Sequence, residues 1–101
     1  MASTASARHG FAVAVAPFPD RDPAAVAFGF VVRWYREERG WSQEGLAHAA
    51  DLHPKYVGTI ERGERSPTLT TILKLSDALD MSAGRLLDAT QRFMADGAPP
   101  D

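Results

Sequence analysis

The sequence predicts a single small all-α domain, and three observations support that prediction. Apolar residues recur at helical spacing in five consecutive segments, short connections separate these segments, and strand-like alternation is absent from the body of the chain. With 101 residues, 45% hydrophobic and 24% charged, the chain can form one core. We expect an arm at 1–24, flexible or exchanged in a dimer, a helical domain at 25–94 and a disordered tail at 95–101.

The first two helices have clear boundary residues. The first is expected from about Ala25 to Arg39, because Gly40 tolerates the left-handed backbone that follows a last turn. The second opens at Ser42, whose hydroxyl can accept a backbone N–H of the first turn. Its inner face is expected to contain Leu46, Ala47 and Ala50.

The remaining three helices are bounded in the same way. The third has Pro54 in its first turn, where the missing N–H costs nothing, and it stops at Gly63. The fourth begins near Thr68 and the fifth after Ser82, since both residue types favour helix starts. Their apolar faces contain Leu69, Ile72, Leu75, Leu79, Leu86, Leu87 and Phe93.

The third helix has a short polar and basic outer strip. At about 100° per residue, Val57 and Ile60 point toward the core, which leaves Lys55, Thr59 and Arg62 facing outward. In a DNA groove, Lys and Thr can contact base edges and Arg can hold a phosphate. The strip alone does not separate a DNA-reading helix from a solvated one, because many surface helices expose these residue types.

The segment before this helix favours DNA binding. A helix-turn-helix needs a tight turn, a small residue where the two helices meet, and apolar residues that lock the second helix onto the first. Ala47 can supply the small contact, and Asp51 with Leu52 carries the turn. Val57 and Ile60 supply the lock. Asp also tolerates the positive φ that such turns require.

The run REERGWSQEGLAHAADLHPKYVGTIERGERSPTLTTILKLSDAL, Arg36 to Leu79, resembles the phage repressor and Cro-like family of bacterial helix-turn-helix regulators, the XRE family. SQ-x-x-LA, a turn, the apolar pair and ERG-x-x-x-P follow the family's order and spacing. The resemblance implies a five-helix, lambda repressor-like fold. It also implies a cytoplasmic, nucleoid-associated regulator that binds a palindromic operator in double-stranded DNA as a homodimer, without enzymatic activity or a cofactor.

The resemblance implies three groups of DNA contacts. Ser42 and Gln43 lie at the start of the second helix, where backbone N–H groups and the helix dipole attract phosphate. The start and outer face of the third helix would read bases through His53, Pro54, Lys55, Tyr56 and Thr59. The loop after that helix would contact the backbone through Arg62, Arg65 and Ser66.

The resemblance also implies an ion pair between Arg36 and Glu61 that braces the third helix. DNA-binding domains are usually basic, so a net charge of -2 argues against DNA binding. If Glu61 is paired with Arg36, its negative charge does not lie on the DNA-binding face, and this argument is weaker. Three residues depart from the family pattern. Asp51 and Asp80 stand where relatives usually have Gly, and Pro54 lacks a hydrogen-bonding side chain at an expected contact.

A second apolar stripe on the first helix predicts a covering partner. It contains Ala27, Phe30, Val31 and Trp34. It lies more than a quarter-turn from the stripe that faces the core, which consists of Phe28, Val32 and Tyr35. The partner could be the apolar arm (Phe11, Val13, Val15, Phe18) or another subunit. Family dimers often form through the last helix, which makes Leu87 and Phe93 a competing surface.

Several other classes of function are not expected. The chain has no cysteine, its three histidines lack metal-ligand spacing, and no catalytic motif or membrane-spanning run is visible. The alternative is a protein-interaction module, such as an antitoxin or accessory subunit, that keeps the fold and binds a protein partner. Salt dependence separates the two readings, because contacts to phosphates weaken steeply as salt rises.

Overall fold

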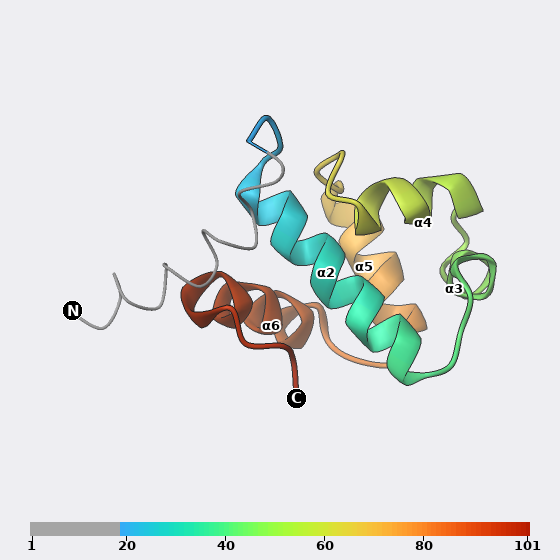
Figure 1. The fold of residues 1–101 in the computed structure, drawn as a ribbon. Coiled ribbons are helices and arrows are strands. Elements are labelled where there is room, and N and C mark those ends of the chain that lie inside the picture. The colour runs from blue at the N-terminus through green and yellow to red at the C-terminus, as the bar shows by residue number, and fades with distance from the viewer. Residues whose placement is uncertain (1–18) are drawn as a thin grey trace.

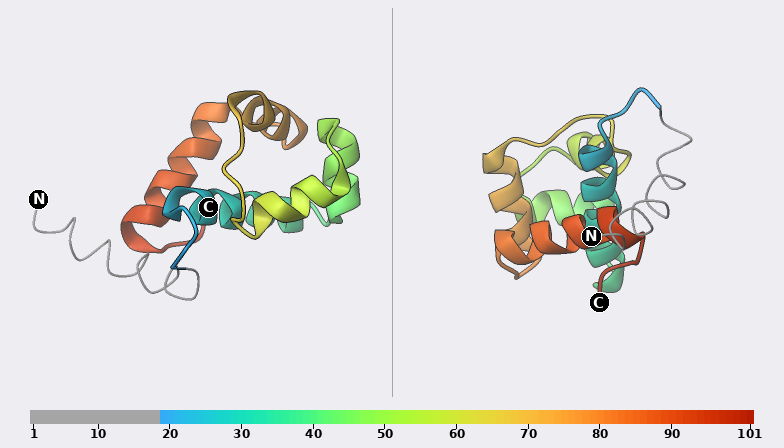
Figure 2. Two further views of the ribbon diagram at one scale, coloured as in Figure 1. Left: turned by 90° about the horizontal axis from the view of Figure 1, so that it is seen from above. Right: turned by 90° about the vertical axis from the view of Figure 1, so that its left-hand side faces the viewer.

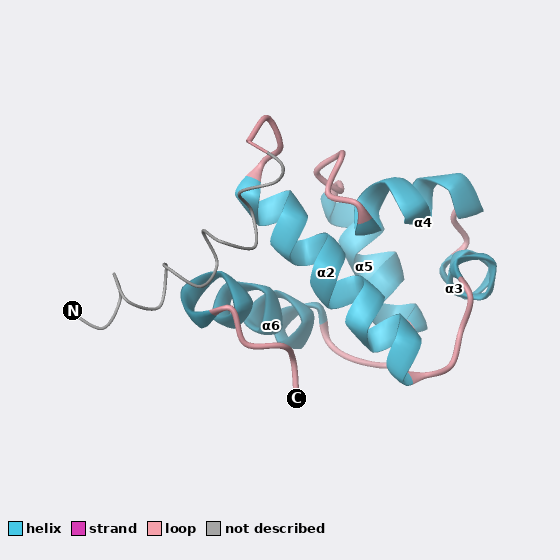
Figure 3. Cartoon of the chain, in the orientation of Figure 1, coloured by secondary structure: helices cyan, strands magenta, loops and turns pink. Residues whose placement is uncertain are grey.

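The structure is a computed structural model, and it describes residues 19–101. These residues form five α-helices and no strand (Figures 1 and 3). The prediction of an all-α five-helix domain is therefore confirmed. The helices are α2 (Pro23–Glu38), α3 (Gln43–Ala50), α4 (Pro54–Glu61), α5 (Leu69–Ala78) and α6 (Ala83–Asp96).

Side-chain caps place the helix starts. Ser42, Thr68 and Ser82 each accept a backbone N–H of the helix that follows, at 3.0 to 3.2 Å. Asp22 caps α2 in the same way, so α2 begins at Pro23, two residues before the expected boundary. At the other end, α6 continues to Asp96, two residues beyond the expected end at 94. The tail after it includes Asp101, whose carboxylate lies 3.5 Å from the Arg92 guanidinium.

Two aspartates occupy turns that glycine usually makes. Asp51, after α3, has φ of 55°, and Asp80, after α5, has φ of 56°. Both lie in the left-handed region, which Asp tolerates better than most residues. The expectation that an aspartate can carry the turn between the second and third helices is therefore confirmed at Asp51.

Helix α2 lies between α4 and α6 and packs against both (Figure 1). Seen from above, α3 and α4 form one end of the molecule and α6 the other (Figure 2). Both apolar stripes of α2 contribute to one core. The largest fully buried side chains belong to Leu46, Ile60, Leu75, Leu79, Leu86, Val31, Val32 and Val57.

The packing buries part of the second stripe of α2, which corrects the assignment of Val31 and Phe93 to an exposed contact surface. Val31 is 0% exposed, and the ring of Phe30 stacks on that of Phe93 with centroids 4.3 Å apart. Phe93 itself is 5% exposed, so Val31 and Phe93 are core residues. A helix with neighbours on two sides can bury two stripes. Trp34 is half-buried, while Phe30 and Leu87 stay partly exposed; the arm's apolar residues lie outside the described part of the chain.

Gly29 marks the closest approach between α2 and α4. A Cβ built on Gly29 would lie 2.2 Å from the carbonyl oxygen of Ile60 and 2.7 Å from that of Glu61. These distances are far below van der Waals contact, so only glycine allows the two backbones to meet here. The position of α4 against the domain therefore depends on the absence of a side chain in α2.

Candidate nucleic-acid interface

Helices α3 and α4 form a tight helix-turn-helix at one end of the molecule. Figure 1 shows α3 end-on and α4 running across the view, so the two helices cross at a steep angle. The turn between them is closed by the N–H of Leu52, which donates to the carbonyl of Ala47 at 2.8 Å. Val57 and Ile60 are at most 1% exposed and anchor α4 in the core. This is the arrangement in which a second helix is presented to a DNA groove.

The outer face of α4 carries the residues that sequence analysis placed there. Lys55 and Arg62 are exposed, while Tyr56 and Thr59 are half-buried at the edges. The Thr59 hydroxyl donates to the carbonyl of Lys55 at 3.0 Å, which leaves its oxygen lone pairs and its methyl group for other contacts. The outer face of α4 therefore presents the Lys55 ammonium and the small amphipathic side chain of Thr59 toward solvent.

His53 has a structural role that the sequence analysis did not assign. Its Nδ1 accepts the backbone N–H of Lys55 at 3.1 Å, so the imidazole caps α4. The signal was present, because a polar residue immediately before a first-turn Pro is in the N-cap position. With Nδ1 engaged as an acceptor, Nε2 is left to donate to another group. Pro54 follows, exposed, in the first turn.

The ion pair expected between Arg36 and Glu61 is present and joins α2 to α4. Arg36 donates from Nε at 2.6 Å and from Nη2 at 3.0 Å to the Glu61 carboxylate, whose side chain is 2% exposed. The hydrogen bond to Glu61 raises the pKa of Arg36, although burial opposes that rise. Arg36 also donates to the carbonyl of Trp41 at 2.7 Å, which fixes the connection into α3.

Gln43 is the third member of this network. Its Nε2 donates to the Glu61 carboxylate at 3.0 Å. The sequence analysis assigned Gln43 to a DNA phosphate and did not detect this bond, because the contact depends on how α3 crosses α4. Ser42, beside it, is exposed and caps α3 through the N–H of Gly45. The exposed Glu44 adds a negative charge to the same first turn.

The loop after α4 holds a cluster of charged side chains. Arg62 donates two hydrogen bonds to the Glu64 carboxylate, from Nε at 3.0 Å and from Nη2 at 3.1 Å. This pairing lowers the pKa of Glu64 and raises that of Arg62. Arg21 donates to the backbone carbonyl of Arg62, and its Nη2 lies 3.6 Å from Glu64. Sequence analysis assigned no role to Glu64 or Arg21.

Two further residues of this loop, Arg65 and Ser66, are exposed, as expected for residues that contact a DNA backbone.

The acidic turn residue Asp51 has a cation beside it. Lys74 of α5 donates to the Asp51 carbonyl at 3.3 Å, and its Nζ lies 3.8 Å from the Asp51 carboxylate. The negative charge that Asp51 brings to this turn is therefore partly neutralised by Lys74 of α5.

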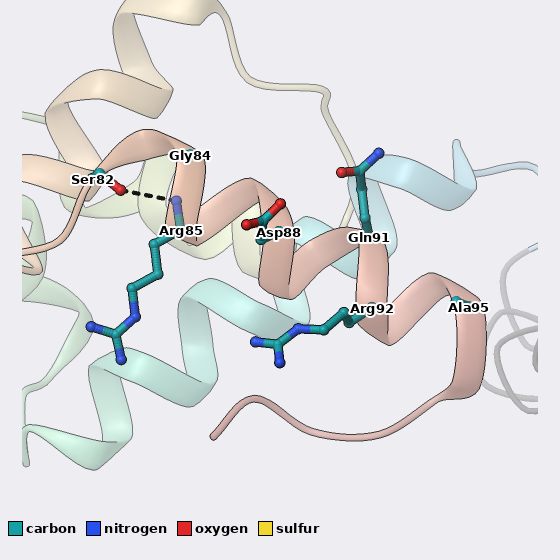
Figure 4. Close-up of a pocket in the computed structure, with 7 residues that line it drawn as sticks. All are labelled: Ser82, Gly84, Arg85, Asp88, Gln91, Arg92 and Ala95. Atoms are coloured by element: carbon teal, nitrogen blue, oxygen red, sulfur yellow. Dashed lines mark hydrogen bonds between the residues drawn. The ribbon is translucent and has the colours of Figure 1, made fainter.

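A separate concavity lies on α6, remote from α4. It is lined by Ser82, Gly84, Arg85, Asp88, Gln91, Arg92 and Ala95 (Figure 4). Arg85 and Arg92 point to the same side of the helix, and the hydrogen bond drawn there is the capping bond that the Arg85 backbone N–H donates to the Ser82 hydroxyl oxygen. Among residues 19–101, no group of three or more His, Asp or Glu side chains is placed to hold a metal ion. No helix in that range is long and apolar enough to cross a membrane.

Comparison with known proteins identifies the family of this helix-turn-helix. A helix-turn-helix family model matches residues 32–86, which include all of α3, α4 and α5. Control protein C.SmaI of Serratia marcescens is 46% identical over 56 residues, covering 55% of this chain and 67% of that protein.

Two solved structures share the fold. The restriction-modification controller protein C.AhdI of Aeromonas hydrophila has a TM-score of 0.60 and 45% identity, covering 61% of this chain and 94% of that one. SinR, a master regulator for biofilm formation solved in complex with DNA, has a TM-score of 0.57 and 35% identity, covering 60% of this chain and 98% of that one.

Proposed function

Because the chain belongs to the XRE family of helix-turn-helix transcriptional regulators, which bind DNA sequence-specifically, we propose that it is a controller protein of the restriction-modification type. In this proposal it occupies a palindromic operator as a homodimer, in the cytoplasm on the nucleoid. The proposal draws on the controller proteins that the chain resembles, C.SmaI and C.AhdI. Occupancy of the operator, without chemistry, regulates transcription.

One observation carries the proposal: α4 is fixed by the Arg36–Glu61–Gln43 network while its outer face stays open to solvent. A base-reading helix must be held rigidly, because hydrogen bonds to base edges require defined positions. Lys55 would donate to guanine O6 or N7, and the Thr59 methyl would contact a thymine methyl. Tyr56 and His53 would extend the readout at the start of the helix.

Contacts to the DNA backbone would set the register. Ser42 and Gln43 lie at the N-terminus of α3, whose unpaired N–H groups and positive dipole end favour phosphate. Gln43 can serve both roles, because its Nε2 donates one hydrogen to Glu61 and carries a second N–H that can donate to a phosphate. On the far side of α4, Arg62, Arg65 and Ser66 would hold the next phosphates.

The homodimer would form through exposed leucines of α5 and α6. Leu69 is 70% exposed, Leu73 is 51% exposed and Leu87 is 38% exposed. Leu87 lines a small apolar groove together with Phe28 and Ile72. Leu69 and Leu73 are four residues apart in α5, so they share one face of that helix. Exposed large apolar side chains next to one another are typical of a protein-protein surface. Two α4 helices brought together this way would read half-sites about 34 Å apart.

Selection from random duplex DNA tests the proposal. The purified chain should enrich a two-fold symmetric site whose half-sites repeat after about one helical turn. Its affinity for the enriched site should fall steeply as salt rises, because phosphate contacts release counterions. Enrichment of no common sequence would contradict sequence-specific binding, and an asymmetric single half-site would contradict the dimer.

A further inference from the structure

We propose that Glu64 sets the affinity of this protein for DNA by competing with phosphate for Arg62. In the DNA-free protein Glu64 holds the Arg62 guanidinium, and on binding Arg62 passes from the carboxylate to a DNA phosphate. The inference rests on the proposed function, since it requires the loop after α4 to face the DNA backbone. It adds an affinity-setting residue that makes no direct contact with DNA.

The geometry of the pair supports a partner exchange. Glu64 offers two oxygens to Nε and Nη2 of Arg62, at 3.0 and 3.1 Å. A phosphate also offers two acceptor oxygens to the guanidinium fork, so it can replace the carboxylate as a bidentate partner. The Arg62 side chain is 54% exposed, which leaves it accessible to an incoming backbone.

The strength of the pair is suited to competition. Exposed ion pairs are weak, because water screens the charges and the two long side chains lose freedom when they pair. Glu64 is 37% exposed on its side chain, so the pair is of this kind. By contrast, the buried Arg36–Glu61 pair a few residues away could not be opened without large cost. Glu64 therefore lowers the affinity for DNA without preventing binding.

Arg21 gives the carboxylate a second partner. Its Nη2 lies 3.6 Å from Glu64, and its Nη1 donates to the backbone carbonyl of Arg62, which anchors Arg21 at this loop. When Arg62 turns to a phosphate, Glu64 still has a cation beside it. Arg21 thereby keeps the negative charge of Glu64 from facing the DNA unpaired.

This exchange predicts a change in salt dependence as well as in affinity. A phosphate contact made by an unpaired arginine releases about one counterion from DNA, which adds about one to the salt slope. If Arg62 must first leave Glu64, the carboxylate regains part of its own counterion atmosphere and the slope is smaller. A purely structural role for Glu64 would not change the slope.

The test measures binding of the full chain to one selected duplex and one unrelated duplex, across a range of salt concentrations. The variants are Glu64→Gln, Arg62→Ala and the double variant, with Asp96→Asn as a control of equal charge change. Asp96 is exposed at the end of α6, remote from α4. Asn at that position can still accept the Ala98 N–H through its amide oxygen.

The expected result is that Glu64→Gln tightens binding to both duplexes about two- to fivefold and steepens the salt slope, while Asp96→Asn changes neither. In the Arg62→Ala background the effect of Glu64→Gln should disappear. If Arg62→Ala weakens binding but Glu64→Gln changes nothing, the inference about Glu64 is wrong, while the proposal that this loop binds DNA is still supported. Tightening that persists without Arg62 would show direct repulsion of phosphate and would overturn the exchange. If Arg62→Ala has no effect, the proposed binding face itself is wrong.

Discussion

The Arg36 guanidinium donates two hydrogen bonds to the Glu61 carboxylate, at 2.6 and 3.0 Å, across the contact between α2 and α4. Glu61 is the last residue of α4, and the same carboxylate accepts a third bond from Gln43 of α3. The end of the candidate recognition helix is therefore tied to both of the helices that support it. If α4 reads DNA as proposed, both stability and recognition depend on this one buried acidic side chain.

Removing Glu61 should destabilise the domain strongly. Glu61→Ala leaves Arg36, a residue that is 9% exposed, without its carboxylate partner, and breaking such a buried pair costs about 3 to 5 kcal/mol. Denaturant unfolding measures the change. Glu38→Ala, which removes an exposed glutamate from the last turn of α2, is the control and should cost less than about 0.5 kcal/mol. Equal effects of the two substitutions would contradict the bracing role.

Adding one methyl group at Gly29 should displace α4. The Cβ of alanine would overlap the carbonyl oxygens of Ile60 and Glu61, and overpacking of this kind typically costs about 1 to 3 kcal/mol. Gly29→Ala should therefore lower the melting temperature and weaken DNA binding together. Gly84→Ala in the first turn of α6 meets only a side-chain oxygen at 3.8 Å and should be neutral or slightly stabilising. A stable Gly29→Ala protein with unchanged binding would show that the two helices do not need this approach.

Some features of the fold were predictable from the sequence, and others were not. The caps and turns were predictable because they are local: Ser42, Thr68 and Ser82 stand at helix starts in the sequence itself. The contact at Gly29 was not, since no local pattern shows which helix will lie over a glycine. Similarly, the burial of both stripes of α2 depends on how many helices surround it, and periodicity shows only which residues share a face.

In the candidate site, too, the sequence predicted some features and not others. Lys55 and Thr59 were placed on the outer face of α4 by helical geometry, and the structure has them there. The pairing of Arg62 with Glu64 was not predictable, because it links residues two apart in a loop whose conformation no periodic pattern specifies. The bond from Gln43 to Glu61 depends on the crossing of α3 and α4, which the sequence does not encode locally.

The Arg62–Glu64 pair should be visible by NMR in the absence of DNA. Because the hydrogen bond from Arg62 lowers the pKa of Glu64, the pair is present at neutral pH and is lost as the pH falls through that lowered pKa. A titration of the Glu64 side-chain carboxyl signal should therefore have its midpoint below the ordinary range for glutamate. In Arg62→Ala the midpoint should move up toward that range; an unchanged midpoint would mean that the two side chains do not pair in solution.

Polar substitutions on the leucine surface should separate the proposed dimer. Leu69→Ser combined with Leu73→Ser removes two exposed apolar side chains, so the fold should keep its melting temperature while self-association weakens. Sedimentation equilibrium gives the mass. The competing surface is on α2, where Phe30 is 38% exposed. If Phe30→Ser dissociates the dimer and the leucine variant does not, the interface lies at α2 and α6 instead.

The central claim is that the outer face of α4 reads bases, and Lys55→Ala measured against every single-base change in one selected half-site tests it most directly. Base preference should disappear at one position, with a loss of about 1 to 3 kcal/mol there, while the preferences at the other positions and the fold remain. A variant that keeps the full pattern of base preferences, with only uniformly weaker binding or none at all, would contradict it.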